Sequence, residues 1–231
     1  NKDYFLGAPD FDRLVFRKVQ SSNLLAGLMS GEIDMLAGGQ LGALTLSDFQ
    51  MAQEEENLVA EAVPSYTHHY VSIDNSNELL TKEVRQAIDH AINKQRIVDE
   101  LLGGYGTVSV GPWGVKHPYF NPDLETDTYD PDAAKALLEQ AGWDESTTLL
   151  LSVPANNAFR EQAAALIQQD LAAVGMTVEI RQYDSAAQFE AILDGTTPLG
   201  MVGSAASVEP NNPIINLFDI HGAWCFGRFQ D

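Results

Sequence analysis

The sequence predicts an α/β fold built on a mixed or parallel sheet with flanking helices. Segments typical of strands alternate with longer segments whose apolar residues recur at helical spacing. Most of the helical segments begin at a capping residue and end at a glycine. The chain has 231 residues and 45% hydrophobic content, which is enough to bury a substantial core. Because ligands of such folds lie beyond the carboxyl ends of strands, the loops that follow strands are the expected place of a site.

Residues 1–75 are expected to form a β-α-β-α-β segment. Gly31 ends the first helix, and Ser47 with Gln50 makes a capping-box pattern at the start of the second. The expected elements are strands over residues 11–19 ("FDRLVFRKV"), 32–39 and 67–75 ("THHYVSIDN"), and helices over residues 24–30 and 47–57.

The strongest helical periodicity lies in residues 81–102 and predicts one long helix. Thr81 can cap its start, and Gly103 with Gly104 can end it. Residues 103–129 are rich in Gly, Pro, Asn and Asp with scattered aromatic residues, which predicts a long ordered loop.

The last part of the chain again alternates helices with strands. The expected elements are a helix between a cap at Asp130 and a stop at Gly142, a strand over 148–154, a helix over 158–174, a strand over 176–183, a helix that begins with a capping box at Ser185 and Gln188, and a strand that leads into the loop after Val202. This last loop lies where a ligand would bind.

Charge and cysteine content narrow the class of partner. The net charge is 13 − 33 = −20, which argues against nucleic acid because phosphate binding depends on Lys and Arg. No stretch approaches the ~20 apolar residues that a membrane-spanning helix needs. Cys225 is the single cysteine, so it cannot form an internal disulfide, and we expect it to pack as a small apolar residue.

Motifs of catalysis or metal binding are absent or broken. Ser109 resembles a nucleophile elbow, but Thr107 stands where the first glycine belongs. His68 and His69 are neighbours on an expected strand and must point to opposite faces, so they cannot chelate one metal together. His117, in the long loop, could touch a ligand, but a lone loop histidine is usually solvated, and we expect this of His117. The sequence therefore predicts a protein that is not an enzyme and needs no cofactor or metal.

Several separated segments resemble one family. The segments "NKDYFLGAPDFDRLVFRKV", "LMSGEIDML", "LTKEVRQAIDHAINKQRIVDELLGGYG", "YDPDAAKALLEQAGW", "REQAAALIQQDLAAVGMTVEI" and "EPNNPIINLF" occur in this order over nearly the whole chain. Together they resemble the family 5 extracellular solute-binding proteins of ABC importers, the dipeptide, oligopeptide and nickel group.

The resemblance implies a type II periplasmic-binding-protein-like fold, in which two lobes joined by crossover strands enclose the ligand. Members are about twice this long, so the chain looks like an interior piece. Residues 1–75 would be the trailing part of lobe one with a crossover strand, and residues 76–231 would be lobe two, incomplete at its C-terminus. The implied partners are a small-molecule or peptide ligand and the membrane subunits of an ABC transporter. We expect a monomer at the periplasmic or extracellular face of the membrane, with a lipid anchor on the full-length protein left open.

The resemblance also indicates what the ligand site has lost. In peptide-binding members the strand before the loop carries a tryptophan and then an aspartate that pairs with the peptide's ammonium group. Alignment on Glu209 and Pro210 places Gly203 at the tryptophan and Ala206 at the aspartate. Dipeptide-binding members have an arginine in the loop that corresponds to residues 155–158, where this chain has only amide side chains. The resemblance thus implies a grip by shape and neutral groups rather than by fixed charges.

A free dipeptide fits such a site poorly, since each lost charge-assisted hydrogen bond is worth about 1.5–3 kcal/mol. A sugar, an opine-like compound or a longer peptide gripped through its backbone fits better. The residues expected to bind the ligand are Asn156, Asn157, Gly203, Ser204, Ala206 and Ser207, with Trp113 as a stacking wall.

Two alternatives concern the site itself. In the first, the loop after Val202 only turns the chain, and the ligand contacts come from the other lobe. In the second the cargo is a metal: His221 could match a histidine of the nickel-binding members, but Gly203 and Ser207 replace the aromatic residues that accompany it there.

Two further alternatives concern the class of function. A receptor, sensor or scaffold that reuses this fold would have its cleft filled by its own side chains. A hydrolase of unrecognised type would have paired carboxylates near Asp184 or Glu209.

Overall fold

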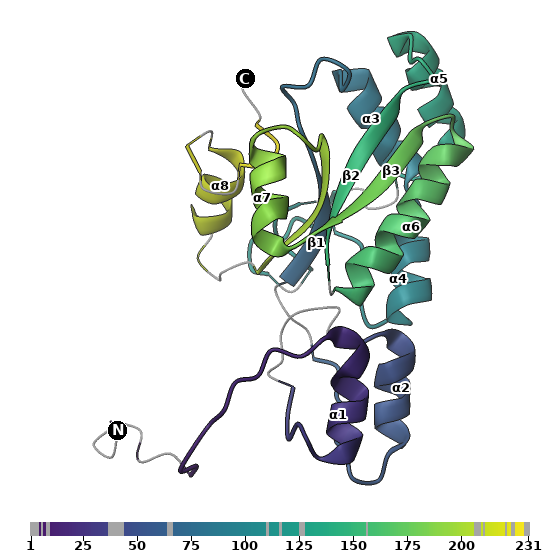
Figure 1. The fold of residues 1–231 in the computed structure, drawn as a ribbon. Coiled ribbons are helices and arrows are strands. Elements are labelled where there is room, and N and C mark those ends of the chain that lie inside the picture. Colours follow the sequence, from purple (N-terminus) through teal and green to yellow (C-terminus); the bar gives the residue numbers. More distant parts are fainter. Residues whose placement is uncertain are drawn as a thin grey trace.

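The computed structural model describes most of the chain (Figure 1). The described residues are 5, 7, 10–36, 44–63, 67–109, 111–115, 117–124, 128–155, 157–205, 209, 211–219, 221–222 and 225–228, without the side chains of 204, 205 and 211–213. In chain order the elements are a short 3₁₀ turn η1 (Ser21–Asn23), α1 (Leu24–Ser30), α2 (Leu46–Glu54), β1 (Thr67–Ile73), α3 (Lys82–Ala91), α4 (Lys94–Leu102), α5 (Pro131–Ala141), β2 (Thr148–Pro154), α6 (Ala158–Ala173), β3 (Thr177–Tyr183), α7 (Ser185–Leu193), β4 (Leu199–Ala205) and α8 (Asn211–Phe218).

The described strands form one mixed sheet in the order β1-β4-β2-β3, which confirms the predicted fold class. β1 and β4 are antiparallel along their whole lengths, from Thr67 opposite Ala205 to Ile73 opposite Leu199. β2 is parallel to β3 over all seven of its residues, but it pairs with β4 at only two positions. The carboxyl ends of β2, β3 and β4 and the amino end of β1 therefore share one edge of the sheet, which we call the carboxyl edge.

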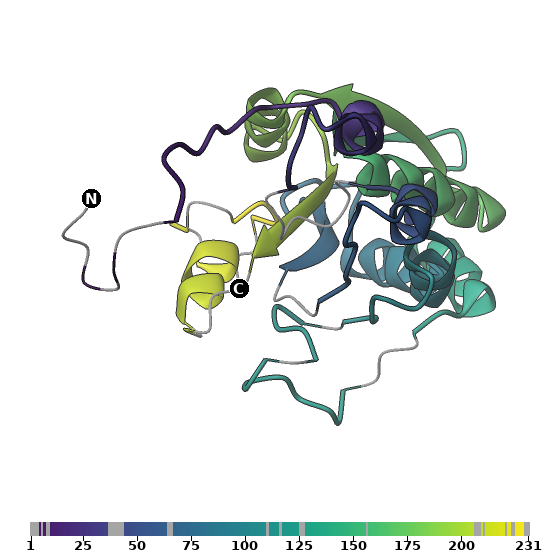
Figure 2. The ribbon, with the colours of Figure 1, turned by 90° about the horizontal axis from the view of Figure 1, so that it is seen from below.

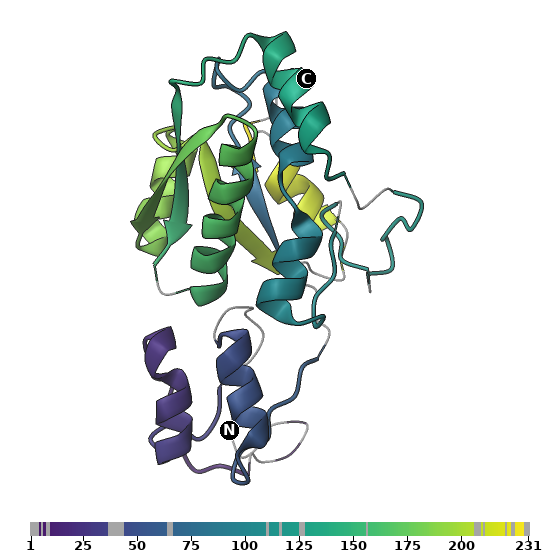
Figure 3. The ribbon, with the colours of Figure 1, turned by 90° about the vertical axis from the view of Figure 1, so that its right-hand side faces the viewer.

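Helices cover both faces of this sheet. On one face α3, α5 and α6 pack against apolar side chains of the strands, among them Leu151, Leu199 and Met201. Because side chains alternate along a strand, Gly200 and Val202 point to the other face, where Ile192 of α7 and Phe226 pack. α1 and α2 lie together below the carboxyl edge, apart from the sheet (Figures 1 and 3). The segment between α4 and α5 projects to one side (Figures 2 and 3).

The expectation for residues 1–75 is wrong in its strands. Of the three expected strands, the described residues contain only the last, β1. Residues 13–20 are irregular, and Phe16 is 79% exposed. A strand requires a hydrogen-bonded neighbour, and the described residues supply none here, so alternation alone does not produce one. Residues 32–36 are also irregular, and 37–39 lie outside the described residues.

The long helix expected over residues 81–102 is two helices. Ile92 has extended backbone (φ −84°, ψ 118°), and the Asn93 side chain caps α4 by accepting from Arg96 N at 2.8 Å. Asn93 N in turn donates to the buried carboxylate of Asp170 on α6, at 3.0 Å. The apolar periodicity continues across the break because both helices bury side chains in the same core.

Most expected helix boundaries are confirmed, and two capping boxes are wrong. The confirmed boundary residues are Gly31, Thr81, Gly103, Asp130 and Gly142. At the start of α2 the cap is Thr45 rather than Ser47, and the helix ends at Glu54. At the start of α7 the cap is Asp184 rather than Ser185.

Gln188 is turned into the sheet instead of capping its helix. β2 and β4 diverge beyond their two paired positions, which leaves backbone carbonyls between them. Gln188 is 1% exposed, and its Nε2 donates to Ser152 O at 3.1 Å and to Met201 O at 3.0 Å. The side-chain amide therefore bridges the two strands where the backbone ladder has stopped.

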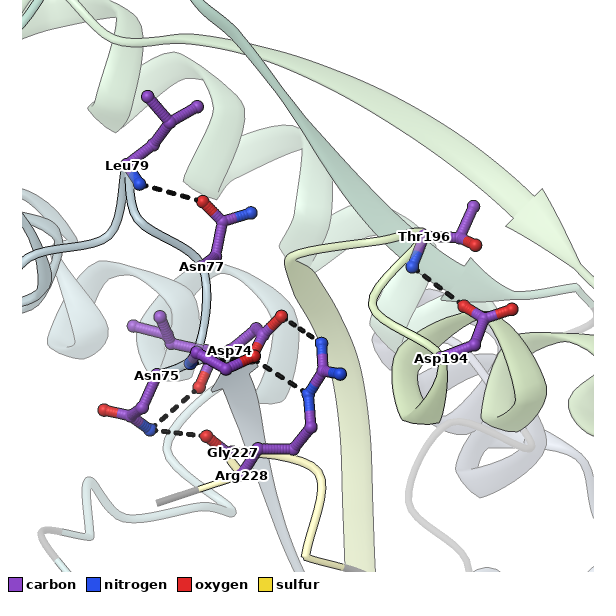
Figure 4. A network of polar contacts seen from close by, with 10 residues as sticks. Asp74, Asn75, Asn77, Leu79, Asp194, Thr196, Gly227 and Arg228 are labelled. Atoms are coloured by element: carbon purple, nitrogen blue, oxygen red, sulfur yellow. Dashed lines mark hydrogen bonds and ion pairs between the residues drawn. The ribbon is translucent and has the colours of Figure 1, made fainter. Parts of the chain in front are cut away.

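A polar network fastens residues 225–228 to the end of β1 (Figure 4). Arg228 donates from Nε to Asp74 Oδ1 at 3.0 Å and pairs through Nη2 with Oδ2, while the Asp74 side chain is only 4% exposed. Asn75 donates from its backbone N and from Nδ2 to Gly227 O, at 2.8 and 2.6 Å. Cys225 is buried beside this network, as expected for a small apolar residue.

Replacing Gln188 by Met should remove the bridge while keeping the length of the side chain. Two buried carbonyls would lose their donor, and we expect the free energy of unfolding to fall by about 2 kcal/mol, measured by urea denaturation. The matched control is Gln182→Met at an exposed glutamine of β3, which should change it by less than about 0.5 kcal/mol. Equal losses in the two variants would contradict a bridging role.

Replacing Arg228 by Met should leave the Asp74 carboxylate buried without its counter-charge. Breaking a buried ion pair at one partner costs about 3 kcal/mol, and urea denaturation should detect this loss. The double variant Asp74→Asn with Arg228→Met should lose less stability than the sum of the single variants. Additive losses would mean that the two side chains do not depend on each other.

Candidate functional site

Three residues from distant parts of the chain meet at the carboxyl edge. His69 on β1 lies opposite Gly203 on β4 in the antiparallel register. Arg160 is in the first turn of α6, which follows β2 after a short loop. We call His69, Arg160 and Gly203 the Arg160 site. It lies beyond the carboxyl ends of strands, where ligands of open α/β sheets bind.

Gly203 makes room for the Arg160 guanidinium. A Cβ atom on residue 203 would lie 2.4 Å from Arg160 Nη2, 2.9 Å from His69 Nδ1 and 3.1 Å from the carbonyl oxygen of His68. The guanidinium therefore lies directly over the backbone of β4, in space that any side chain at this position would occupy.

His69 orients this guanidinium as a neutral acceptor. Arg160 Nε donates to His69 Nδ1 at 3.0 Å, so Nδ1 carries no proton and the neutral ring carries its proton on Nε2. Burial, and then the positive charge of Arg160, lower the pKa of His69 to about 3. The ring also meets Phe159 edge-on at a centroid distance of 5.0 Å. His69 thus stays uncharged at any physiological pH.

Arg160 differs from four other arginines of the chain in that no ion pair joins it to an acid within the described residues. Arg17, Arg96, Arg181 and Arg228 each pair with a carboxylate. Within the described residues, the hydrogen bond to His69 is the one polar contact of the Arg160 side chain. Burial lowers the pKa of Arg160, but a guanidinium remains charged in proteins. The site is thus a partly buried positive charge in a protein of net charge −20.

Burial also raises the pKa of the nearby Tyr70 phenol, to about 12, so that side chain is neutral as well. His68 stacks on Tyr70 at 5.4 Å on the opposite face of β1 from His69, as the alternation of a strand predicts.

The structure brings together two of the residues expected to bind ligand. Gly203 belongs to the Arg160 site, and Asn157 caps α6 next to it, where Oδ1 accepts from Arg160 N at 3.0 Å. Asn156, Ala206, Ser207 and the side chain of Ser204 lie outside the described residues.

Trp113 belongs to a separate aromatic group in the long loop. Its ring lies 5.9 Å from that of His117 and 6.0 Å from that of Tyr119. His117 is 4% exposed, so the expectation of a solvated histidine is wrong. The expected stacking role of Trp113 stays a prediction.

Sequence reasoning missed Arg160 and His69. The expectation that this end of the sheet holds only neutral groups is not met, because Arg160 reaches back over the loop from the first turn of α6. The arginine three positions after Asn157 was the available signal. No pattern in the sequence indicated the strand register that places His69 opposite Gly203.

The described residues bear on two features expected of the other functional classes, a carboxylate near Asp184 and a metal cluster. Asp184, considered for a hydrolytic carboxylate pair, accepts hydrogen bonds from Ala186 N and Ala187 N as the cap of α7. The described part of the chain has no cluster of three or more potential metal-ligating residues. None of its helices has the length and apolar character needed to cross a bilayer.

Comparison with known proteins identifies the family. The model of the bacterial extracellular solute-binding proteins, family 5 (middle region), matches residues 1–224. The chain belongs to this family. The family 5 chain is 29% identical over 188 residues to the glutathione-binding protein GsiB of Pectobacterium atrosepticum, covering 78% of this chain and 34% of that protein. It is 27% identical over 204 residues to the dipeptide-binding protein of Escherichia coli, covering 80% and 37%.

A solved structure confirms the periplasmic-binding-protein-like fold. The crystal structure of NikA from Staphylococcus aureus in complex with Ni(L-His)2 is similar over 100% of this chain and 49% of that chain, with a TM-score of 0.85 and 20% identity. The family 5 chain thus spans about a third of the length of its curated relatives and about half of this solved one.

The low pKa of His69 predicts how stability changes with pH. Above its unfolded pKa of 6.5, His69 is neutral in both states; below it, only the unfolded state takes up the proton until about pH 3. His69 therefore lowers stability as pH falls through this range, by at most about 1.4 kcal/mol per pH unit. Between pH 7 and pH 5, His69→Asn should lose about 2 kcal/mol less stability than the wild type in urea denaturation.

The exposed His221 supplies the control for this experiment. His221→Asn should lose as much stability on acidification as the wild type. If His69→Asn also behaves like the wild type, the imidazole is not held neutral in the folded protein.

Proposed function

We propose that this family 5 protein is the substrate-binding component of an ABC importer and captures a peptide-like solute. The observation that carries the proposal is the Arg160 site, a polar constellation at the carboxyl edge of a binding-protein fold. The names of the two curated relatives above support a peptide-like cargo, because both glutathione and a dipeptide are peptides. Neither name supports a sugar, which the sequence analysis had left as a possible ligand.

The proposed mechanism is closure of two lobes around the solute. Residues 1–75 would belong to lobe one and residues 76–231 to lobe two, with β1 as a crossover strand. The place of α1 and α2 below the carboxyl edge supports this division (Figure 1). A solute that contacts both lobes stabilises the closed arrangement, and membrane subunits of the importer would recognise that form. The protein would bind without catalysis, as a monomer at the periplasmic or extracellular face of the membrane.

A thermal-shift screen followed by calorimetry tests the proposal. The sample is the 231-residue chain, alongside any longer natural polypeptide that contains it. Ligand at 100 times its Kd stabilises by about 2.7 kcal/mol, which raises the Tm of a protein of this size by several degrees. We expect this rise with pooled tripeptides or glutathione.

The same screen includes oligosaccharides and nickel with histidine. If only the oligosaccharides, or only nickel with histidine, raised the Tm, a peptide-like cargo would be contradicted. No rise with any compound on the longer polypeptide would favour a receptor or scaffold role for the fold.

A further inference from the structure

We infer that a contact between α2 and the first residues after α4 holds lobe one over the carboxyl edge and thereby raises the affinity for the solute. Leu46 and Phe49 supply the contact from α2, and Gly103 and Tyr105 supply it from the other side. We call it the α2 contact. It deepens the proposed function, on which it rests, because it acts on the closing of the same two lobes.

The aromatic half of the contact has a geometry that pairs of rings prefer. The rings of Phe49 and Tyr105 meet edge to face, with centroids 5.4 Å apart and an interplanar angle of 80°. Tyr105 is 58% exposed, so its side chain is not part of a core. Loss of the Tyr105 ring should therefore weaken the contact to α2 without unfolding the sheet.

The aliphatic half of the contact depends on a glycine. Gly103 ends α4 in the left-handed region, at φ +55°, where glycine is favoured. A Cβ atom on this residue would lie 3.0 Å from both Cδ1 and Cδ2 of Leu46. The end of α4 thus offers α2 a surface without a side chain, and Leu46 lies close against it. The residue that ends α4 also lets the two helices approach each other.

The polar contacts described for residues 10–63 do not tie them to residues 67–228. These hydrogen bonds and ion pairs join residues of the segment to each other, as in the pair of Arg17 with Glu32. A contact made of apolar groups can break and form again as the lobes move, because breaking it leaves no polar group without a partner. The strength of the α2 contact then sets the fraction of the free protein that has α2 in place.

The position of the contact links it to solute binding. α1 and α2 lie below the carboxyl edge, the edge at which the Arg160 site lies (Figures 1 and 3). The α2 contact shares no residue with that site, so it holds the lobe in place without touching the solute. When a fraction of the molecules is competent to bind, the apparent Kd rises in inverse proportion to that fraction. A weaker α2 contact therefore means weaker binding.

Variants of Tyr105 test the inference on the 231-residue chain and on any longer natural polypeptide that contains it. Tyr105→Ala removes the ring, and Tyr105→Phe keeps it. Calorimetry with glutathione and with the tripeptide pool should give a Kd about 3- to 10-fold higher for Tyr105→Ala than for the wild type, since an edge-to-face pair is worth about this factor. Tyr105→Phe should bind like the wild type. So should the matched control Leu124→Ala, at an exposed apolar residue of the same loop.

A distance measurement tests the arrangement of the lobes without any solute. Spin labels are attached at Glu54→Cys on α2 and Glu139→Cys on α5, and the buried Cys225 is replaced by Ser so that no third label attaches. Double electron–electron resonance gives the distribution of distances between the two labels. In the free protein Tyr105→Ala should widen this distribution, whereas Tyr105→Phe and Leu124→Ala should leave it unchanged. Circular dichroism and urea denaturation check that each variant folds.

The outcomes separate the inference from the proposed function. Equal distance distributions in the wild type and Tyr105→Ala overturn the inference, and so does an unchanged Kd when the distribution widens. If the wild type binds neither glutathione nor the tripeptide pool, the proposed function fails. The label distances in the free protein then decide alone whether the α2 contact holds lobe one in place.

Discussion

The position of β4 is the constraint on which the rest of the structure depends. β4 pairs along its whole length with β1 but at only two positions with β2, so the sheet opens between β2 and β4 toward the carboxyl edge. Two backbone carbonyls in this opening would be left without donors, and the buried Gln188 amide satisfies both. Nearer the edge, Arg160 reaches from the start of α6 to the backbone of β4 at Gly203. The bridge is therefore a consequence of this divergence, and the candidate site lies at the same end of the sheet.

Local patterns were enough to predict most elements. The prediction of β2, β3, α5 and α6 is confirmed. The signals for these elements, which are apolar runs, alternation, caps and terminal glycines, each lie within a few neighbouring residues. Where the prediction failed, the missing information was non-local. Residues 11–19 alternate like a strand but have no neighbour among the described residues. The break at Asn93 is fixed by Asp170 on another helix, whose carboxylate accepts from the Asn93 backbone. The capping box expected at α7 is wrong because Asp184 caps that helix and Gln188 donates to carbonyls of two strands instead.

The candidate site divides in the same way. Gly203 and Asn157 could be expected near this end of the sheet because Asn157 follows β2 and Gly203 lies near the end of β4. Arg160 was missed because it lies beyond the loop, in the first turn of α6, from which an arginine side chain is long enough to reach back across the loop. His69 could not be found at all, since its place opposite Gly203 comes from the β1–β4 register, which no local pattern sets. The identity of residue 203 then gains a different meaning. The family resemblance implies that Gly203 replaces an aromatic residue; in the structure the absence of a side chain leaves the space that the Arg160 guanidinium occupies.

The large negative charge of the chain and the positive charge of Arg160 act over different distances. At physiological ionic strength the Debye length is about 8 Å, so most of the 33 acidic residues are screened from a solute in the Arg160 site. A carboxylate at about 4 Å from the guanidinium would gain about 4 kcal/mol of Coulomb energy at the effective dielectric of a protein surface, before the cost of desolvation. For an anionic solute, such a local pair would therefore count for more than the net charge, which acts mainly on the approach of the solute and on solubility. An acidic protein can bind an anion, provided that its site holds a cation that no acid of its own has neutralised.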